Sequence, residues 1–246
     1  MEANANCTSR CSCRIIQFLE SSIGKKIMVA LAGVLLCGFL IAHLLGNLLM
    51  FVGGEAFNRY AETLEHNPLL PVAEIGLVAL FLMHAALSVR ATLANLSARP
   101  VGYEVYKGKG ARTPGSRTMA WTGTLILAFI IIHVATFKFD IGGLKGQVAG
   151  QEESLFAHVL GWFDNPLYAA FYVLAVGGVG LHLSHGVQSA LQTFGISHPR
   201  YTPLLKKAGL AFAFLIFSGF ASLPLYFGFF YKTNPACCAP IEGGSK

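Results

Sequence analysis

The sequence predicts an all-α membrane protein with five transmembrane helices. Of the 246 residues, 54% are hydrophobic and only 12% are charged, which is too apolar for a soluble domain of this length. Five segments contain no Asp, Glu, Lys or Arg, and a helix needs roughly 20 apolar residues to cross a ~30 Å hydrocarbon core. These uncharged segments are residues 27–54, 75–89, 119–137, 165–199 and 208–231.

The five segments differ in what they carry. The first, 27–54, is expected to be a retained helix, because it is far longer than the roughly 7–15 apolar residues of a cleaved signal peptide. The second is the shortest, and Glu74 interrupts its entry from Leu69. The third and fourth are uninterrupted. The fifth contains no histidine and is expected to flank a bundle formed by the other four.

The connecting segments predict the orientation. One side would hold 13 of the 18 basic residues, and the other side only five of them with nine of the twelve acidic residues. The positive-inside rule then places the N-terminus in the cytoplasm. The 13 are Arg10, Arg14, Lys25, Lys26, Arg90, Arg99, Lys107, Lys109, Arg112, Arg117, Arg200, Lys206 and Lys207.

This asymmetry also accounts for the net charge of +6, so nucleic acid is not needed as a partner. A basic cytoplasmic face suits either anionic lipid or a soluble protein. Residues 1–20 are expected to form a polar cytoplasmic extension, residues 21–232 the transmembrane domain, and residues 233–246 an external tail. No role follows for the cysteines outside the spans, which are Cys7, Cys11, Cys13, Cys237 and Cys238.

Four of the apolar segments contain a histidine at nearly the same depth. A titratable ring in hydrocarbon is costly, so an intramembrane histidine indicates a functional site by default. Four at matched depth are best explained by two metals that each need two imidazoles. They are His43 (17 residues after Lys26), His84 (15 after Leu69), His133 (15 after Thr118) and His182 (16 after Pro166).

Depth alone predicts how these histidines pair. Successive helices run in opposite directions, and 15–17 residues correspond to about 23–25 Å of helix. His43 and His133 would therefore lie together in the outer half of the membrane, and His84 and His182 together in the inner half. The two levels would be roughly 16 Å apart. A four-helix bundle is a usual place for ligands on facing helices, so this pattern predicts two stacked b-type haems, each iron held by one pair.

The remaining four histidines are weaker candidates for iron ligands. His185 lies one turn from His182, and we favour His182 because its offset matches the other helices. His185 would then contact a haem propionate or a backbone carbonyl. His66, His158 and His198 fall in connecting segments, where a solvated loop is the expected environment.

Two groups of short motifs stand out near the first and fourth apolar segments. They are SSIGKK at residues 21–26, AG at 32–33 and HLLGNL at 43–48, followed by HLSHG at 182–186, SA at 189–190 and QTFG at 192–195. With these motifs the chain resembles a known family, the diheme cytochrome b membrane subunit of succinate:quinone oxidoreductases. The resemblance covers residues 21–231 and implies haem-iron ligation by His43, His84, His133 and His182.

The resemblance implies the membrane anchor of a three-subunit succinate dehydrogenase, respiratory complex II, in the cytoplasmic (inner) membrane. A flavoprotein would oxidise succinate and an iron–sulfur protein would pass the electrons on. This subunit would carry them through two b haems to a quinone, expected to be menaquinone. The chain itself has no dinucleotide fingerprint and no iron–sulfur cysteine set, so it would not act on succinate alone.

Charged residues near the span ends are candidates for the remaining contacts. Lys25, Lys26 and Arg90 are candidate propionate partners of the inner haem, and Arg59 and Lys138 of the outer one. Quinone reduction consumes protons, and Glu62, Glu65 and Glu74 lie at the outer mouth between the first two spans. Most such loop charges are topology signals or simply solvated.

Two other functions remain open at this stage. One is a diheme cytochrome b that serves a different dehydrogenase, such as a hydrogenase or formate enzyme. The other is a transporter that uses histidines as a proton relay. An absorption spectrum would separate the relay from the cytochromes, and co-purifying partners would separate the two cytochromes.

Overall fold

The computed structural model describes residues 14, 16–98, 114–141 and 154–231, and all regular structure in these ranges is helical. Among these residues, five helices are long and apolar enough to cross a membrane, which confirms the predicted all-α fold with five candidate spans and is consistent with a multi-pass membrane protein. They are α2 (Ser22–Leu48, continued by the 3₁₀ turn η1, Leu49–Phe51), α4 (Leu70–Ser97), α5 (Pro114–Phe137), α7 (Pro166–Thr193) and α8 (Thr202–Leu225, continued by the π-helical turn η2, Tyr226–Phe230). The five cysteines without an assigned role and the predicted tail lie outside the described residues.

The long helices extend beyond the uncharged segments. The predicted second span is a 28-residue helix, α4, that contains both Glu74 and Arg90, so Glu74 does not mark the start of this helix. Lys25 and Lys26 likewise lie within α2. A charge-free run marks only the part of a helix inside hydrocarbon, and charged side chains with long stems are accommodated near the helix ends.

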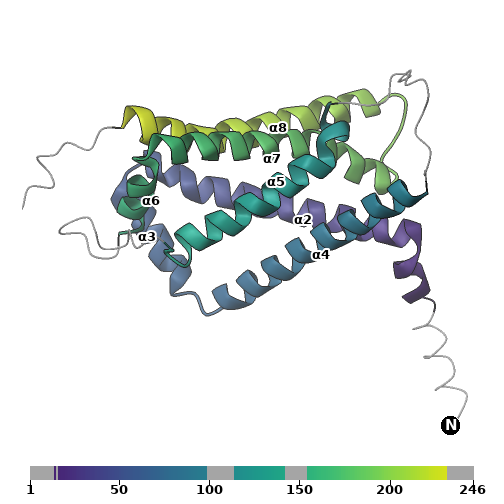
Figure 1. Cartoon of the computed structure of the whole chain (residues 1–246), viewed down its shortest axis with the longest axis horizontal. Helices are drawn as coiled ribbons and strands as arrows, with labels where there is room; N and C mark the ends of the chain where they lie inside the picture. The colour runs from purple at the N-terminus through teal and green to yellow at the C-terminus, as the bar shows by residue number, and fades with distance from the viewer. Residues whose placement is uncertain (1–13, 15, 99–113, 142–153, 232–246) are drawn as a thin grey trace, which may run out of the picture.

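Two short helices lie together at one end of the molecule, which we call the α3–α6 end (Figure 1). They are α3 (Gly54–Glu65) and α6 (Leu155–Phe163). Asn58 of α3 joins them: its amide nitrogen donates to Ser154 Oγ at 2.9 Å, and its amide oxygen accepts from the Phe156 backbone N–H at 2.9 Å. Ser154 itself caps α6. Both segments were expected to be loops.

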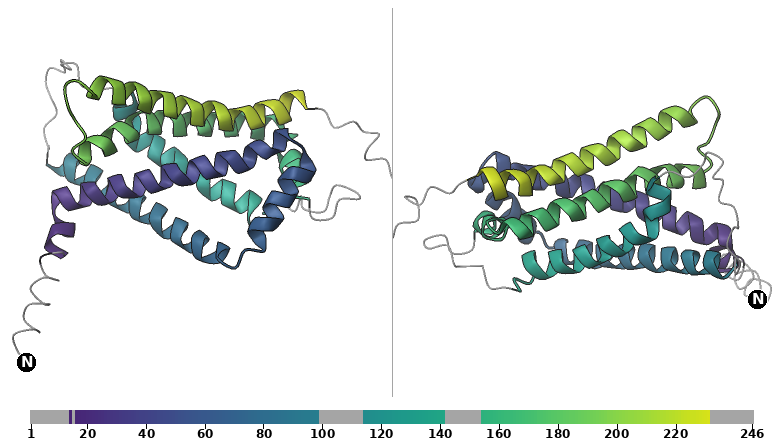
Figure 2. Two further views of the ribbon diagram at one scale, coloured as in Figure 1. Left: turned by 180° about the vertical axis from the view of Figure 1, so that it is seen from behind. Right: turned by 45° about the horizontal axis from the view of Figure 1, so that its top comes forward.

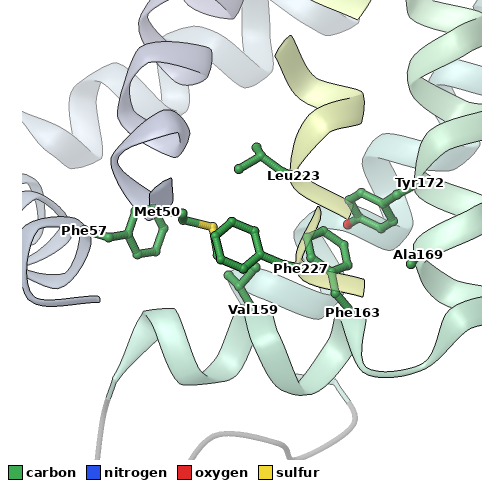
Figure 3. Packing of buried hydrophobic residues seen from close by; sticks show 8 residues of the cluster. All are labelled: Met50, Phe57, Val159, Phe163, Ala169, Tyr172, Leu223 and Phe227. Carbon is green, nitrogen blue, oxygen red and sulfur yellow. The ribbon is translucent and has the colours of Figure 1, made fainter. Parts of the chain in front are cut away.

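A cluster of buried apolar side chains fills the same end (Figure 3). The cluster draws on the ends of the long helices as well as on α3 and α6, so the short helices are part of the core rather than surface additions. Its members are Met50, Phe57, Val159, Phe163, Ala169, Tyr172, Leu223 and Phe227.

Helix α7 is the centre of the fold, and it packs against α8, α5 and α2 (Figures 1 and 2). The fifth helix, α8, which was expected to flank a bundle of the other four, is in contact with the helix that carries His182. Helix α8 packs closely on α7, whereas α4 has no buried residue and packs mainly against α2. The N-terminal part of the described chain lies at the end opposite α3 and α6 (Figure 1).

Candidate functional site

The structure brings the four matched histidines together in the two pairs that their depths predict. The ring centroids of His43 on α2 and His133 on α5 are 5.8 Å apart, with ring planes at 86°. Those of His84 on α4 and His182 on α7 are 6.4 Å apart, with planes at 66°. Each pair therefore links two different helices.

The distance between the two histidine pairs can be estimated along α7 and α5, because residues of each helix contact both pairs. On α7, Tyr172 contacts His133, and His182 lies ten residues further along. At 1.5 Å per residue this corresponds to about 15 Å. On α5, Thr122 contacts His182 and lies 11 residues before His133, or about 16 Å. The pair of His43 and His133 is the one nearer the α3–α6 end.

Hydrogen bonds indicate the tautomers of His84 and His182, the pair farther from the α3–α6 end. His84 Nδ1 lies 3.1 Å from the backbone carbonyl oxygen of Val29 on α2. A carbonyl can only accept, so Nδ1 must carry the hydrogen. His182 Nδ1 lies 3.2 Å from Thr122 Oγ1, whose own hydrogen is donated to the Thr118 carbonyl at 2.9 Å. Thr122 therefore accepts from His182 Nδ1, and both rings keep a bare Nε2.

The pair of His43 and His133 has polar partners at the same ring position. His133 Nδ1 lies 3.0 Å from the Tyr172 hydroxyl, which is buried in the cluster of Figure 3. Tyr172 is in turn 3.3 Å from the Tyr168 hydroxyl. His43 Nδ1 lies 3.4 Å from the side-chain amide of Asn47, which also donates to the His43 carbonyl at 2.8 Å. The Tyr172 hydroxyl can donate to or accept from His133 Nδ1, whereas the amide nitrogen of Asn47 can only donate to His43 Nδ1.

This donor set fits two six-coordinate haem irons. A metal-binding histidine usually donates its other ring N–H to a protein acceptor, which fixes its tautomer. In all four histidines Nδ1 is the nitrogen with a partner, and within the described residues none of the four Nε2 atoms has one. Imidazole nitrogens bind metals at about 2 Å, so two rings on opposite sides of one metal have centroids roughly 6 Å apart. The described residues contain no cluster of three or more metal-binding side chains, so the donors come in pairs.

Aromatic side chains surround the pair of His43 and His133. Phe39 stacks on His43 at 5.2 Å, and Phe220 of α8 lies 5.7 Å from the same ring. Phe129 and Phe137 lie 5.6 and 5.3 Å from His133. The predicted flanking helix therefore contributes to this site through Phe220, although it carries no histidine.

Two of the basic candidates for the inner haem, Lys25 and Arg90, lie together at the end opposite α3 and α6. Lys25 and Arg90 line one groove of about 480 Å³ between the ends of α2 and α4, together with Leu19, Glu20, Met28 and Leu87. Lys26, next along α2, is exposed. His185 is half-buried beside Gly115 of α5. Within the described residues it makes no hydrogen bond, and its contact with a haem propionate or a backbone carbonyl stays a prediction.

Two of the five charged candidates at the α3–α6 end, Lys138 and Glu74, are paired with each other. Lys138 Nζ contacts Glu74 Oε1 at 2.5 Å, which ties α5 to α4. Arg59 pairs with Glu55 one turn away on α3 at 2.9 Å, and its side chain is 77% exposed. This exposure does not support the predicted propionate contact. Glu62 and Glu65 are also exposed on α3.

Gly33 and the glycines that precede His182 have different roles. A Cβ on Gly33 would meet His84 Cε1 at 3.3 Å, so this glycine lets the ring approach the Val29 carbonyl one turn earlier on α2. The glycines before His182 instead accommodate apolar side chains: Cβ atoms at Gly178 and Gly180 would meet Leu125 and Phe217 at 2.7 and 3.1 Å. Close helix packing explains them, as is common in membranes.

One histidine is not where the sequence placed it. His158 was expected in a solvated loop, but it lies in α6 and is 2% exposed. Its Nε2 is 3.2 Å from the Thr136 carbonyl and its Nδ1 is 3.7 Å from Asp140 Oδ1. The other two, His66 and His198, are exposed as expected. Sequence gives little signal for the burial of His158, because its contacts come from residues 18 and 22 positions away.

Comparison of the chain with protein-family models, with curated proteins and with solved structures found no match.

Proposed function

We propose that this protein is the diheme cytochrome b membrane anchor of a succinate:quinone oxidoreductase. The single observation that carries the proposal is the arrangement of four intramembrane histidines in two pairs about 15 Å apart, in which every Nδ1 has a polar partner and no Nε2 has one within the described residues. The motif resemblance described above supplies the choice of dehydrogenase.

The residues divide the task between them. His84 and His182 would hold one haem iron through Nε2, and His43 and His133 the other. Bound in this way, the haems supply one-electron transfer between two levels of the membrane. Val29 orients the ring of His84, and Thr122 orients that of His182. Lys25 and Arg90 line a groove at the same end and suit haem propionates, since lysine and arginine favour carboxylate partners.

The distribution of charge supports an orientation with the α3–α6 end outside. The described basic residues of the opposite end include Lys206 and Lys207 of α8 as well as Lys25 and Arg90, and positive residues favour the cytoplasm. The flavoprotein and iron–sulfur subunits would then dock at that cytoplasmic end. The quinone, expected to be menaquinone, would be reduced near His43 and His133.

The first experiment expresses the full chain with haem supply and records reduced-minus-oxidised spectra. We expect two low-spin b haems, and alanine at His43, His84, His133 or His182 should each remove one haem or make it high-spin. His66→Ala is the matched control, because His66 is exposed directly after the last residue of α3, and this variant should keep both haems. A purified chain with no reducible Soret band would contradict the proposal and favour the proton-relay transporter.

A second experiment identifies the partners. The tagged chain should co-purify a flavoprotein and an iron–sulfur protein with succinate dehydrogenase activity. In that complex His133→Ala should abolish quinone reduction yet spare succinate oxidation with an artificial acceptor at the soluble subunits. Capture of a hydrogenase or formate dehydrogenase instead would favour the other cytochrome class. Wild-type quinone reduction by the His133→Ala complex would place the quinone at the cytoplasmic end.

A further inference from the structure

The contact between Tyr172 and His133 is one end of a longer chain of polar side chains. Tyr168 and Tyr172 are four residues apart on α7, and His133 and Thr136 are three apart on α5, so each couple lies on one face of its helix. The packing of α5 against α7 brings the two couples together. Three contacts link them in the order His133 Nδ1, Tyr172 hydroxyl, Tyr168 hydroxyl and Thr136 Oγ1, at 3.0, 3.3 and 3.0 Å.

The chain is largely shielded from solvent. Tyr172 is 5% exposed and Thr136 4%, and the half-buried ring of Tyr168 lies 4.8 Å from that of Trp162. Within the described residues the two tyrosine hydroxyls make no hydrogen bond outside the chain. A buried hydroxyl without a partner is costly, so these groups must satisfy one another.

The chain can run in only two directions, because each hydroxyl has a single hydrogen to donate. In the first, His133 Nδ1 donates to Tyr172, Tyr172 to Tyr168, and Tyr168 to Thr136. In the second, Thr136 donates to Tyr168, Tyr168 to Tyr172, and Tyr172 to His133 Nδ1, so that the hydrogen of a neutral imidazole lies on Nε2. Only the first direction leaves Nε2 free to bind a metal.

We propose that Tyr168, with Thr136 behind it, is a positioning residue that keeps His133 in the tautomer able to bind iron. This rests on the function proposed above. Tyr168 accepts the hydrogen of Tyr172 and so leaves a lone pair of Tyr172 for His133 Nδ1–H. Thr136 accepts the hydrogen of Tyr168 in the same way. Hydrogen bonds in such a chain strengthen one another, so His133 becomes a more basic ligand than Tyr172 alone would make it.

The hydrogen on the His133 ring can be located without any haem. ¹⁵N NMR of the full haem-free chain in nanodiscs, with labelled histidine, distinguishes a ring nitrogen that carries a hydrogen from one that does not. The signals that vanish in His133→Gln belong to His133. At about pH 8, where an ordinary histidine is neutral, Tyr168→Phe should lower several-fold the fraction with hydrogen on Nδ1, because the Tyr172 hydrogen then has only that nitrogen as an acceptor. The same fraction in the wild type and in Tyr168→Phe would overturn the proposal.

The second arm measures the reduction potential of the haem proposed for His43 and His133. Tyr168→Phe should raise this potential and leave that of the other haem unchanged, since a less basic ligand stabilises the oxidised iron less. Because Tyr168 acts through Tyr172, adding Tyr168→Phe to Tyr172→Phe should cause no further shift. Equal shifts from Tyr168→Phe in both backgrounds would show that Tyr168 acts by another route and would refute the proposal.

Thr136 offers a matched pair of variants for the same measurement. Thr136→Val keeps the shape of threonine but removes the last oxygen of the chain, and it should raise the same potential. Thr136→Ser keeps the hydroxyl and should behave as the wild type. Tyr226→Phe controls for the loss of a phenol, because the Tyr226 hydroxyl makes no hydrogen bond within the described residues, and it should change neither potential.

The two arms fail in different ways. Equal potentials in Thr136→Val and Thr136→Ser would refute the part assigned to Thr136. A wild-type chain that binds no haem would refute the proposed function, and the NMR arm would still decide whether Tyr168 controls the tautomer of His133.

Discussion

Replacement of Thr122 by valine should raise the reduction potential of the haem that we propose for His84 and His182. Valine keeps the shape of threonine but removes the Oγ1 that accepts from His182 Nδ1 at 3.2 Å. A hydrogen bond at Nδ1 makes the ring a more basic ligand, and a more basic ligand stabilises the oxidised iron. Its loss therefore favours the reduced iron.

The size of this shift has an upper limit set by one hydrogen bond. Such a bond contributes about 0.5–1.5 kcal/mol, and 1.4 kcal/mol corresponds to about 59 mV for one electron. If the whole bond acted on the oxidised state alone, the potential would rise by about 20–60 mV. An anaerobic redox titration of the purified chain, followed at the haem bands, measures it.

The matched control for this titration is Thr124→Val. Thr124 lies on the same helix, is exposed, and donates only to the Ala120 carbonyl at 3.0 Å. It should leave both potentials unchanged. If Thr122→Val shifts neither potential, or if Thr124→Val gives the same shift, then Thr122 does not act on His182 as the geometry indicates.

Three further changes test other contacts. Tyr172→Phe should raise the reduction potential of the haem proposed for His43 and His133 by a similar amount, since it removes the hydroxyl beside His133 Nδ1. A shift in the potential of the haem proposed for His84 and His182 instead would contradict this. Gly33→Ala should broaden or shift the spectrum of the haem proposed for His84, because the new Cβ would lie 3.3 Å from that ring. Its control is Gly76→Ala on α4, whose Cβ would meet nothing within 4 Å and should leave the spectrum unchanged. Equal spectra for the two variants would count against the contact. His185→Ala should keep two low-spin haems, and loss of one would make His185 rather than its neighbour the ligand.

The sequence predicts the large features of this fold because they depend on local composition and on helix rise. Runs without charge locate five helices, and counting 1.5 Å per residue is enough to pair His43 with His133. Neither step needs a contact between distant residues. The same counting says nothing about a helix that carries no histidine, so it could not foresee that Phe220 of α8 lies against His43.

The unpredicted features all depend on contacts between residues far apart in the chain. Asn58 and Ser154 are 96 positions apart, and their hydrogen bond helps to place α6 as a packed helix rather than a loop. The partner of His84 is a backbone carbonyl, that of Val29, and every residue has one, so no side-chain pattern could indicate it. His158 appears exposed in the sequence only because its neighbours in space are not its neighbours in the chain.

The lack of buried residues in α4 has a consequence for how the protein is assembled. Helices α2, α5, α7 and α8 pack against one another, while α4 is attached chiefly along α2, so the second of the five long helices has the least packing against the others. A ligand held by both His84 and His182 would join α4 directly to α7, and anything that binds only the joined form stabilises it by mass action. Cofactor supply would then limit the yield of the mature membrane protein, and the cofactor-free chain would expose α4 to membrane quality control.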